Sequence, residues 1–342
     1  MTYPDILELR VDGIKWETPD TATFYFVEKI LRPVPYKAGQ FLTFIFGHHH
    51  EEIRRSYSLS SSPDEPRLAI TVKRISNGEI SRFLLNKVKV GNILTAVKPA
   101  GVFTVPAYES GKDVVYFAAG SGFTPVLSHL KYILNRQGNS KLHLIYSNQN
   151  KASTLFHNEL NELATNYRNR LNITYLLSSE SNRLNNNLVE RLVNEQLNFA
   201  KEQAEFYLCG PFAYMRMIRL TLLYMGIAYK HIHKENFVLE TVPVTGTAVN
   251  YPPRNIRINY NGQGHDIQVG ENQTILQAAL QNNIRLPYSC RHGICSACMA
   301  NCTSGQIEMA KNEVLTDTEL AGGRILTCTG HPITDGVEIV YL

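Results

Sequence analysis

This chain of 342 residues lacks both long apolar runs and a strong net charge. No stretch approaches the roughly 20 consecutive apolar residues that cross a bilayer, and residues 1–13 lack the basic-then-apolar pattern of a secretion signal. The formal net charge is only +4 and is dispersed along the chain, which argues against a nucleic-acid groove. We therefore expect a soluble, cytoplasmic protein that contacts neither membrane nor nucleic acid.

Cysteine is sparse everywhere except in one short segment. The chain has six cysteines, of which four lie between Cys290 and Cys302, while Cys209 stands alone and Cys328 follows. In the absence of a secretion signal, this crowding indicates metal ligation or redox chemistry and not a disulfide framework. The remaining composition, 44% hydrophobic and 19% charged, is that of a globular protein whose length predicts two or three domains.

Residues 1–105 and 106–237 differ in how their apolar residues are spaced. Residues 1–105 carry short alternating runs broken by Gly, Pro and Asn, which predict an antiparallel β-barrel with one helix near 79–87. Residues 106–237 alternate apolar strands with helical patterns, which predicts an α/β domain with a parallel sheet. The expected strands are 6–11, 21–27, 41–46, 56–60 and 68–73 in the first part and 114–119, 142–146, 173–177, 206–209 and 231–237 in the second. The expected helices of the second part are 125–136, 154–167, 188–194 and 211–225.

A linker and a third domain follow. Residues 238–253 are rich in Thr, Val and Pro, show no core face and are interpreted as the linker. Residues 254–342 then predict a compact α+β unit with a hairpin near 259–269, a helix near 274–282, the cysteine loop and a last strand at 337–341.

The spacing of the cysteines predicts an iron–sulfur site. Cys290, Cys295 and Cys298 read C-x4-C-x2-C, and 29 residues separate Cys298 from Cys328, which is the spacing of plant-type [2Fe-2S] ligands. Zinc also suits four thiolates, but zinc sites usually come as two CxxC pairs and Cys328 has no such mate. Cys302 is expected to be a spare, buried thiol. The segment around these ligands resembles the plant-type ferredoxin domain, which implies a β-grasp fold that passes single electrons.

A short motif in the barrel predicts a flavin. Arg55-Ser56-Tyr57-Ser58 lies on an expected strand, where an aromatic ring can stack on a flat cofactor, Arg can hold a phosphate and a hydroxyl can bond a ring nitrogen. Gly78 precedes a helix whose N-terminus is an anion site. Alone, the tetrapeptide also fits an ordinary strand. Together with the segment 99–103, these motifs resemble the flavin-binding barrel of the ferredoxin–NADP reductase superfamily.

This resemblance implies FAD as the cofactor, with FMN as the alternative. It places Arg55 on the flavin phosphates, Tyr57 against the isoalloxazine and Ser58 near its N5. The other candidate flavin residues are Ser56, Val72, Lys73, Gly78, Ile80 and Ser81, the last three around the pyrophosphate. His48, His49 and His50 lie next to two glutamates without partners at metal-ligand spacing, so we interpret them as a solvated turn.

The second domain carries a candidate dinucleotide site. Gly120 and Gly122 follow an apolar strand and open a helix, so the backbone can approach a pyrophosphate. The third glycine of GxGxxG is absent, but G-x-G-x-x-P, ending at Pro125 and including Thr124, resembles the form found in the reductase superfamily. Cys209-Gly210-Pro211 resembles its C-G-P element, which implies Cys209 near the nicotinamide C4. A buried structural thiol is the alternative.

The identity of the nicotinamide donor is open. NAD sites usually carry an acid near the end of the second strand, whereas cations favour the 2′-phosphate of NADPH. Residues 147–151 read Ser-Asn-Gln-Asn-Lys, with no acid and one Lys, which favours NADPH. Farther on, residues 233–237 resemble the segment that closes this domain in related reductases, where an aromatic or acidic side chain approaches the flavin.

The order of flavin barrel, nucleotide domain and C-terminal ferredoxin resembles the reductase subunits of phenylacetyl-CoA epoxidase and other multicomponent oxygenases. The resemblance implies an NAD(P)H-dependent reductase in which a hydride passes to FAD, with Ser58 and Cys209 as catalytic positions. Single electrons then pass to the [2Fe-2S] cluster and on to a partner oxygenase. The linker supports the hypothesis that the ferredoxin domain swings between flavin and partner. The alternatives are a reductase of another redox protein, of hybrid-cluster or Rieske type, and a non-enzymatic redox sensor.

Overall fold

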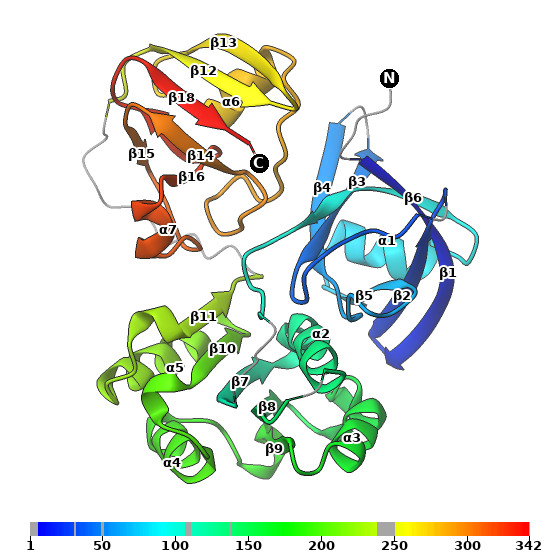
Figure 1. Cartoon of the computed structure of the whole chain (residues 1–342). Helices are drawn as coiled ribbons and strands as arrows, with labels where there is room; N and C mark the ends of the chain where they lie inside the picture. Colours follow the sequence, from blue (N-terminus) through cyan, green and yellow to red (C-terminus); the bar gives the residue numbers. More distant parts are fainter. Residues whose placement is uncertain are drawn as a thin grey trace. The chain divides into compact units, whose positions relative to one another are not determined.

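The structure is a computed structural model that describes residues 6–30, 32–48, 51–106, 111–136, 138–237 and 250–341. The chain forms two compact units, Met1–Val238 and Leu239–Leu342 (Figure 1). His49, His50 and most of the expected linker, residues 238–249, lie outside the described residues, so the interpretations of those segments stay predictions. No helix in the described part of the chain is long and apolar enough to span a membrane.

The first sheet of unit Met1–Val238 is the predicted antiparallel barrel. Its strands are β1 (Ile6–Thr18), β2 (Thr21–Glu28), β3 (Phe41–His48), β4 (Glu51–Ser58), β5 (Leu68–Lys73) and β6 (Ile93–Ala100), in the order β4-β3-β6-β1-β2-β5. All neighbouring strands are antiparallel. Just after β4, Leu59 bridges Ile70 of β5, and the Ser60 amide donates to the Ala69 carbonyl at 2.8 Å. These contacts bring the two edges of the sheet together.

Helix α1 (Glu79–Lys87) lies at the residues that its pattern predicts. Ile80, Leu84 and Leu85 recur at helical spacing and are buried against the barrel core, which includes Phe24 and Phe44.

Three barrel strands differ from the expectations from sequence. Strand β1 runs to Thr18, well beyond the expected 6–11. Strand β4 begins at Glu51 and ends at Ser58, earlier than the expected 56–60. Strand β6, which contains Pro99, was not among the expected strands. The register explains how Pro99 is accommodated, since Phe41 faces Ala100 and Thr43 faces Val97 with a bulge between them. A bulge does not require the ladder hydrogen bond that proline cannot donate.

The second sheet of this unit is fully parallel. Its order is β11-β10-β7-β8-β9, with β7 (Asp113–Ala119), β8 (Lys141–Asn148), β9 (Leu171–Leu177), β10 (Glu205–Cys209) and β11 (Ile232–Glu235). The helices are α2 (Phe123–Leu134), α3 (His157–Asn166), α4 (Asn186–Gln196) and α5 (Phe212–Tyr224). Each expected strand and helix of this domain is present, with ends that differ by a few residues.

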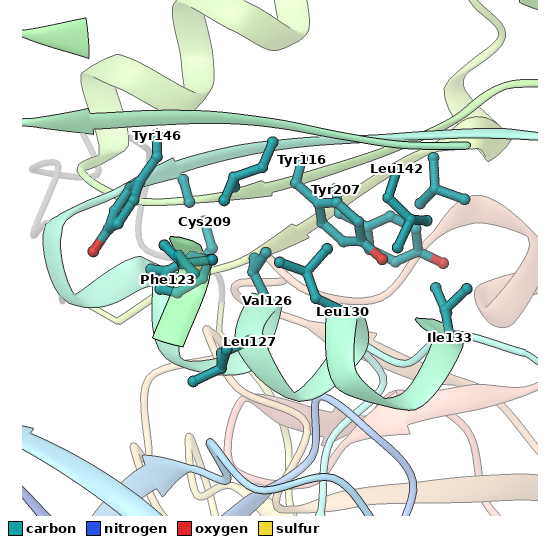
Figure 2. Packing of buried hydrophobic residues seen from close by; sticks show 14 of the residues in the cluster. Tyr116, Phe123, Val126, Leu127, Leu130, Ile133, Leu142, Tyr146, Tyr207 and Cys209 are labelled. Carbon is teal, nitrogen blue, oxygen red and sulfur yellow. The ribbon is translucent and has the colours of Figure 1, made fainter. Parts of the chain in front are cut away.

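Side chains that alternate along β7 enter two separate cores. Tyr116 faces the core under α2, whereas Val115 and Phe117 face the core on the other side of the sheet. Figure 2 shows Val126 and Leu130 of α2 directed toward the sheet. Both faces of the sheet are therefore covered, as a parallel sheet requires.

Unit Leu239–Leu342 contains a five-stranded mixed sheet of order β13-β12-β18-β14-β16 and the pair β15-β17. The strands are β12 (Arg254–Tyr260), β13 (Gln263–Val269), β14 (Met299–Ser304), β15 (Ile307–Met309), β16 (Arg324–Leu326), β17 (Gly330–Pro332) and β18 (Val337–Val340). The predicted hairpin turns at Asn261-Gly262, both with positive φ, which suits a two-residue turn. Helix α6 (Ile275–Gln281) starts at Thr274, which forms a capping box with Gln277, and the short helix α7 (Asp317–Ala321) was not expected.

Candidate functional site

A cavity of about 650 Å³ opens at the carboxyl ends of the parallel strands. In a parallel α/β sheet this edge is where ligands bind, because the loops and helix N-termini converge there. The lining comes from the ends of β7 to β10, from Lys73 at the end of β5 and from Phe237. The lining residues are Lys73, Ala119, Gly120, Ser121, Gly122, Ser147, Asn148, Gln149, Ser153, Leu176, Ser178, Asn182, Arg183, Leu184, Gly210, Pro211, Tyr214 and Phe237.

Two glycines, Gly122 and Gly210, let the backbone approach closely on one side of this cavity. A Cβ on Gly122 would lie 2.3 Å from the Cys209 carbonyl oxygen, and a Cβ on Gly210 would lie 2.9 Å from the Ala119 Cβ. Gly120 has φ +53 and faces open space. The loop after β7 therefore packs against the loop after β10 with room for a ligand in front of Gly120. This loop leads into α2, whose N-terminus has no side-chain cap and can receive an anion.

The charge of the cavity matches a phosphorylated ligand. The described residues that line it include the cations Lys73 and Arg183 and no carboxylate. Neutral donors at the ends of β8 and β9 add further hydrogen-bonding groups. The site can thus hold the phosphates of a dinucleotide by backbone amides, a helix terminus and two cations.

Cys209 and Glu235 lie behind the cavity lining as register partners on β10 and β11. Both side chains are buried, Cys209 completely. Burial, aided by the charge of Glu235, raises the pKa of the Cys209 thiol well above its usual value, and burial raises the pKa of Glu235 to about 8. Cys209 is consequently a neutral thiol that can pack against a ligand but cannot act as a thiolate nucleophile.

The predicted flavin motif occupies the end of β4. Arg55 is exposed, Ser58 is buried, and the Ser56 hydroxyl lies 2.8 Å from the Thr43 hydroxyl of β3. Tyr57 packs edge-on to Phe44 with ring centroids 6.2 Å apart, and burial raises its pKa to about 12. The motif therefore offers one exposed guanidinium, one neutral aromatic ring and one buried hydroxyl, which fits the phosphate and ring system of FAD.

The second predicted flavin element lies at the start of α1. Gly78 is the N-cap residue and makes no side-chain cap, so the first amides of the helix are available to an anion. A Cβ on Gly78 would lie 2.6 Å from the Ser81 hydroxyl, which itself donates to the Gly78 carbonyl at 3.1 Å. Ile80 and Ser81 are buried, as is Val72 of β5. The local backbone thus suits a pyrophosphate.

The four predicted cluster ligands converge in unit Leu239–Leu342. Cys295 Sγ lies 3.1 Å from Cys290 Sγ, and Cys328 hydrogen-bonds both Cys290 and Cys298. Hydrogen bonds from Cys295 and Cys328 hold the pKa of the Cys290 thiol below its usual value. Four sulfurs of this kind are the soft donor set that iron–sulfur clusters use.

Neighbouring backbone closes around these cysteines. Gly293 has φ +69, and a Cβ there would lie 2.5 Å from the Lys311 carbonyl oxygen. The Thr327 amide and hydroxyl both donate to the Cys298 carbonyl, at 3.3 and 3.1 Å, which fixes the segment before Cys328 on the cysteine loop.

Cys302 corrects one expectation. It lies on β14, hydrogen-bonds the Ser304 carbonyl at 3.2 Å and is half-buried, not buried. Strand β14 places it among residues that reach the surface, because the following Thr303 and Ser304 are exposed.

Only some of the residues that were predicted to bind the nicotinamide nucleotide line the cavity. Gly120, Gly122, Gly210 and Pro211 line it together with Lys73, which sequence assigned to the flavin. Thr124, Pro125 and Cys209 are buried outside the lining, and Thr124 donates to the Ser121 carbonyl at 3.0 Å. Sequence reasoning missed Arg183, Ser178 and Tyr214. Their signal is positional, since Ser178 and Arg183 follow the third strand of a parallel sheet at its ligand-binding edge.

Comparison with known proteins gives three family matches along the chain. Residues 8–105 match the oxidoreductase FAD-binding domain, residues 117–220 the oxidoreductase NAD-binding domain and residues 258–332 the 2Fe-2S iron-sulfur cluster binding domain. The three matches follow the order flavin, nucleotide, cluster.

Two similar curated proteins span the whole chain. The chain is 31% identical to the ferredoxin reductase component of 3-ketosteroid-9-alpha-monooxygenase from Rhodococcus rhodochrous, covering 97% of this chain and 96% of that protein. It is 30% identical to one of the subunits of 1,2-phenylacetyl-CoA epoxidase from Escherichia coli K12, covering 97% of both.

Solved structures agree on the fold. Phthalate dioxygenase reductase superposes with a TM-score of 0.62 at 24% identity and covers 98% of both chains. An intact type IV self-sufficient cytochrome P450 monooxygenase superposes with a TM-score of 0.74 at 22% identity, and this chain spans 41% of that longer one.

Proposed function

Because this chain belongs to the oxygenase reductase components that combine FAD-binding, NAD-binding and 2Fe-2S domains, we propose that it delivers electrons from NADPH to a separate oxygenase. It is an NAD(P)H oxidoreductase whose cofactors are FAD and a [2Fe-2S] cluster. When bound, FAD accepts a hydride from the nicotinamide and the cluster carries electrons one at a time. The observation that carries the proposal is the convergence of four cysteines in a unit that follows flavin and nucleotide domains in the same chain.

Residues of the barrel are proposed to bind and orient FAD. The exposed guanidinium of Arg55 holds a phosphate, while the uncapped start of α1 at Gly78 receives the pyrophosphate. The half-buried ring of Tyr57 stacks on the flavin and the buried Ser58 hydroxyl donates to it.

Residues of the cavity are proposed to hold the nicotinamide nucleotide. Gly120 and Gly122 admit its pyrophosphate next to the start of α2, and Cys209 packs as a neutral thiol behind the reacting ring. Phe237, a residue that is 43% exposed and lines the cavity, covers part of the same region and reduces its contact with water.

NADPH is proposed as the donor because the described lining of the cavity has no acid at the end of β8, where an NAD site usually carries one, and has a cation, Arg183, in the loop after β9. Arg183 lines the cavity beside Ser178 and Asn182, and no carboxylate does so among the described residues. An R183A variant should lose about tenfold in kcat/KM for NADPH, from loss of one charge-assisted phosphate contact, and little for NADH. Steady-state kinetics with both nucleotides measures this. Equal losses for the two nucleotides would contradict a 2′-phosphate contact.

The proposed acceptor is an oxygenase, by analogy with the curated relatives, which serve oxygenases of different substrates. Anaerobic absorbance titration of the purified protein with limiting NADPH, then NADH, tests the internal path. Bleaching of the flavin bands followed by loss of the cluster bands is the expected sequence. A bound flavin that neither nucleotide reduces would refute the assignment of the cavity, and rapid turnover with cytochrome c distinguishes a reductase from a redox sensor.

A further inference from the structure

Helix α2 connects the nucleotide cavity to the flavin barrel. Its N-terminus continues the loop of Gly120 and Gly122, and its apolar side packs on the parallel sheet through Val126 and Leu130 (Figure 2). Several of its polar residues contact the barrel. The helix is therefore packed between two domains of the same compact unit.

Two of these contacts are buried. The Ser128 hydroxyl donates to the carbonyl of Ser61, in the loop after β4, and His129 Nε2 lies 3.1 Å from the Phe103 carbonyl oxygen. Both Ser128 and His129 are fully buried. Burial lowers the pKa of His129 to about 3, so its ring is neutral at working pH. A Cβ on Gly39 would lie 2.1 Å from that ring, which shows how closely the barrel packs on α2.

Two ion pairs join the same barrel loop to the later part of the helix. Arg136, just after the last residue of α2, donates to both carboxylate oxygens of Asp64, at 2.6 and 3.0 Å. Lys131 Nζ lies 3.1 Å from Glu65, and its side chain is only 17% exposed. Lys131 also pairs at 2.6 Å with Glu159 of α3, which belongs to the nucleotide domain itself. The adjacent residues Asp64 and Glu65 thus hold two cations at this end of α2 by bonds that cross between domains.

We propose that Lys131 and Arg136 are positioning residues for hydride transfer, which they serve by fixing α2, and with it the pyrophosphate loop, on the flavin barrel. This inference rests on the proposed function of the cavity. Neither residue lines the cavity, so each acts through the helix.

The reason lies in the geometry of a rigid helix. At about 1.5 Å per residue, Lys131 stands roughly 13 Å along the axis from Gly122, and a helix transmits a tilt at one end to the other. Displacing bound reactants by about 1 Å can slow a reaction as much as a hundredfold. Anchors on the later part of α2 therefore set the distance between the nucleotide, whose pyrophosphate is held at the start of α2, and the flavin, held by the barrel.

The test uses the full FAD-loaded chain and exploits the two partners of Lys131. The double variant D64N/E65Q removes both carboxylates on the barrel side, whereas the control E159Q removes only the partner within the nucleotide domain. Flavin reduction by saturating NADPH, followed anaerobically by stopped flow, should slow about tenfold in D64N/E65Q while the nucleotide Kd changes by less than about twofold. E159Q should keep the wild-type rate.

Two further readouts separate positioning from stability. The long-wavelength charge-transfer absorbance of stacked nicotinamide and flavin should weaken in D64N/E65Q, and amide hydrogen exchange of α2 should rise in that variant without nucleotide. The variant D64E/E65D, which keeps both charges, should recover most of the rate. Equal slowing in E159Q, or an unchanged rate and exchange in D64N/E65Q, overturns the positioning role while leaving the proposed function intact. A wild-type flavin that NADPH and NADH both fail to reduce removes the proposed function and this inference together.

Discussion

Gly120 and Gly122 stand two residues apart, yet the structure tolerates a methyl group at them very differently. At Gly122 an added Cβ meets backbone atoms of Cys209 and Gly210 at 2.3 to 2.9 Å, and backbone cannot move aside cheaply. At Gly120 the Cβ meets open space, so only the positive φ of +53 opposes it.

We expect G122A to lose about 2 kcal/mol of unfolding free energy through overpacking and to bind NADPH poorly. The matched variant G120A should lose about 1 kcal/mol from left-handed backbone strain. Urea unfolding of the FAD-loaded protein measures both. Equal destabilisation of the two variants would show that the contact with Cys209 does not limit residue 122.

Single residues also show where sequence reasoning reaches its limit. The glycines of the pyrophosphate loop and the cysteines of the cluster loop were found from sequence. Glycine has no side chain and cysteine carries a thiol, and in each motif the residues lie within a few positions of one another. Arg183 was missed because a surface arginine in a loop carries no motif. Only the topology of the sheet, which brings the loop after β9 to the same edge as Gly120, gives Arg183 its place in the cavity.

At the scale of elements, the amino-terminal edge of the parallel sheet holds a buried carboxylate. Asp113, at the start of β7, is fully buried and accepts hydrogen bonds from His143 of β8 at 2.7 Å and from the amides of Asn198 and Phe199, also at 2.7 Å. Burial opposes its charge, but these hydrogen bonds outweigh that effect and lower its pKa below 3.8. One side chain thus joins two strands to the segment after α4.

The sign of the pH dependence follows from this lowered pKa. The contribution of Asp113 is complete above its unfolded pKa near 3.8 and is lost as the pH falls through the folded value. D113N should cost about 2 kcal/mol at pH 7, and the gap to wild type should narrow at pH 3. Urea unfolding at the two pH values measures the difference in unfolding free energy.

The control is D12N, at a partly exposed ion pair with Arg67, and its unfolding free energy should differ little from that of wild type. A gap that stays constant with pH would mean that Asp113 does not titrate as argued.

Helices and strands were predictable from sequence where the apolar residues recur at a single clear spacing. Helix α1 matches its expected ends because an apolar stripe, a preceding glycine and a final lysine agree. Strand β6 and helix α7 were missed for two different reasons. In β6 the bulge at Pro99 is a property of pairing with β3, which sequence alone does not reveal, and α7 is too short to show a period.

At the scale of the whole molecule, the two compact units have separate cores and separate cofactors. Any ligand that binds only the folded state stabilises the unit that holds it. C328S should therefore abolish the cluster and lower the melting transition of unit Leu239–Leu342, with the FAD-containing transition unchanged. C302S should keep both, because Cys302 bonds Ser304 and does not share hydrogen bonds with the four clustered thiols.

Calorimetry measures the melting transitions of both variants, and iron and sulfide analysis measures their cluster content. A shift of the flavin-linked transition in C328S would indicate that the units unfold together, and loss of iron in C302S would overturn the ligand assignment.

The packing of α2 between the sheet and the barrel bears on how such reductases can be recombined. A chimera that takes its nucleotide domain from a relative, cut at the connection between β6 and β7, would separate Lys131 and Arg136 from their partners Asp64 and Glu65. The natural unit of exchange is the nucleotide domain together with the loop after β4. Chimeras that take both the nucleotide domain and the loop after β4 from one relative should keep that relative's rate of flavin reduction. Chimeras that take only the nucleotide domain should be slower.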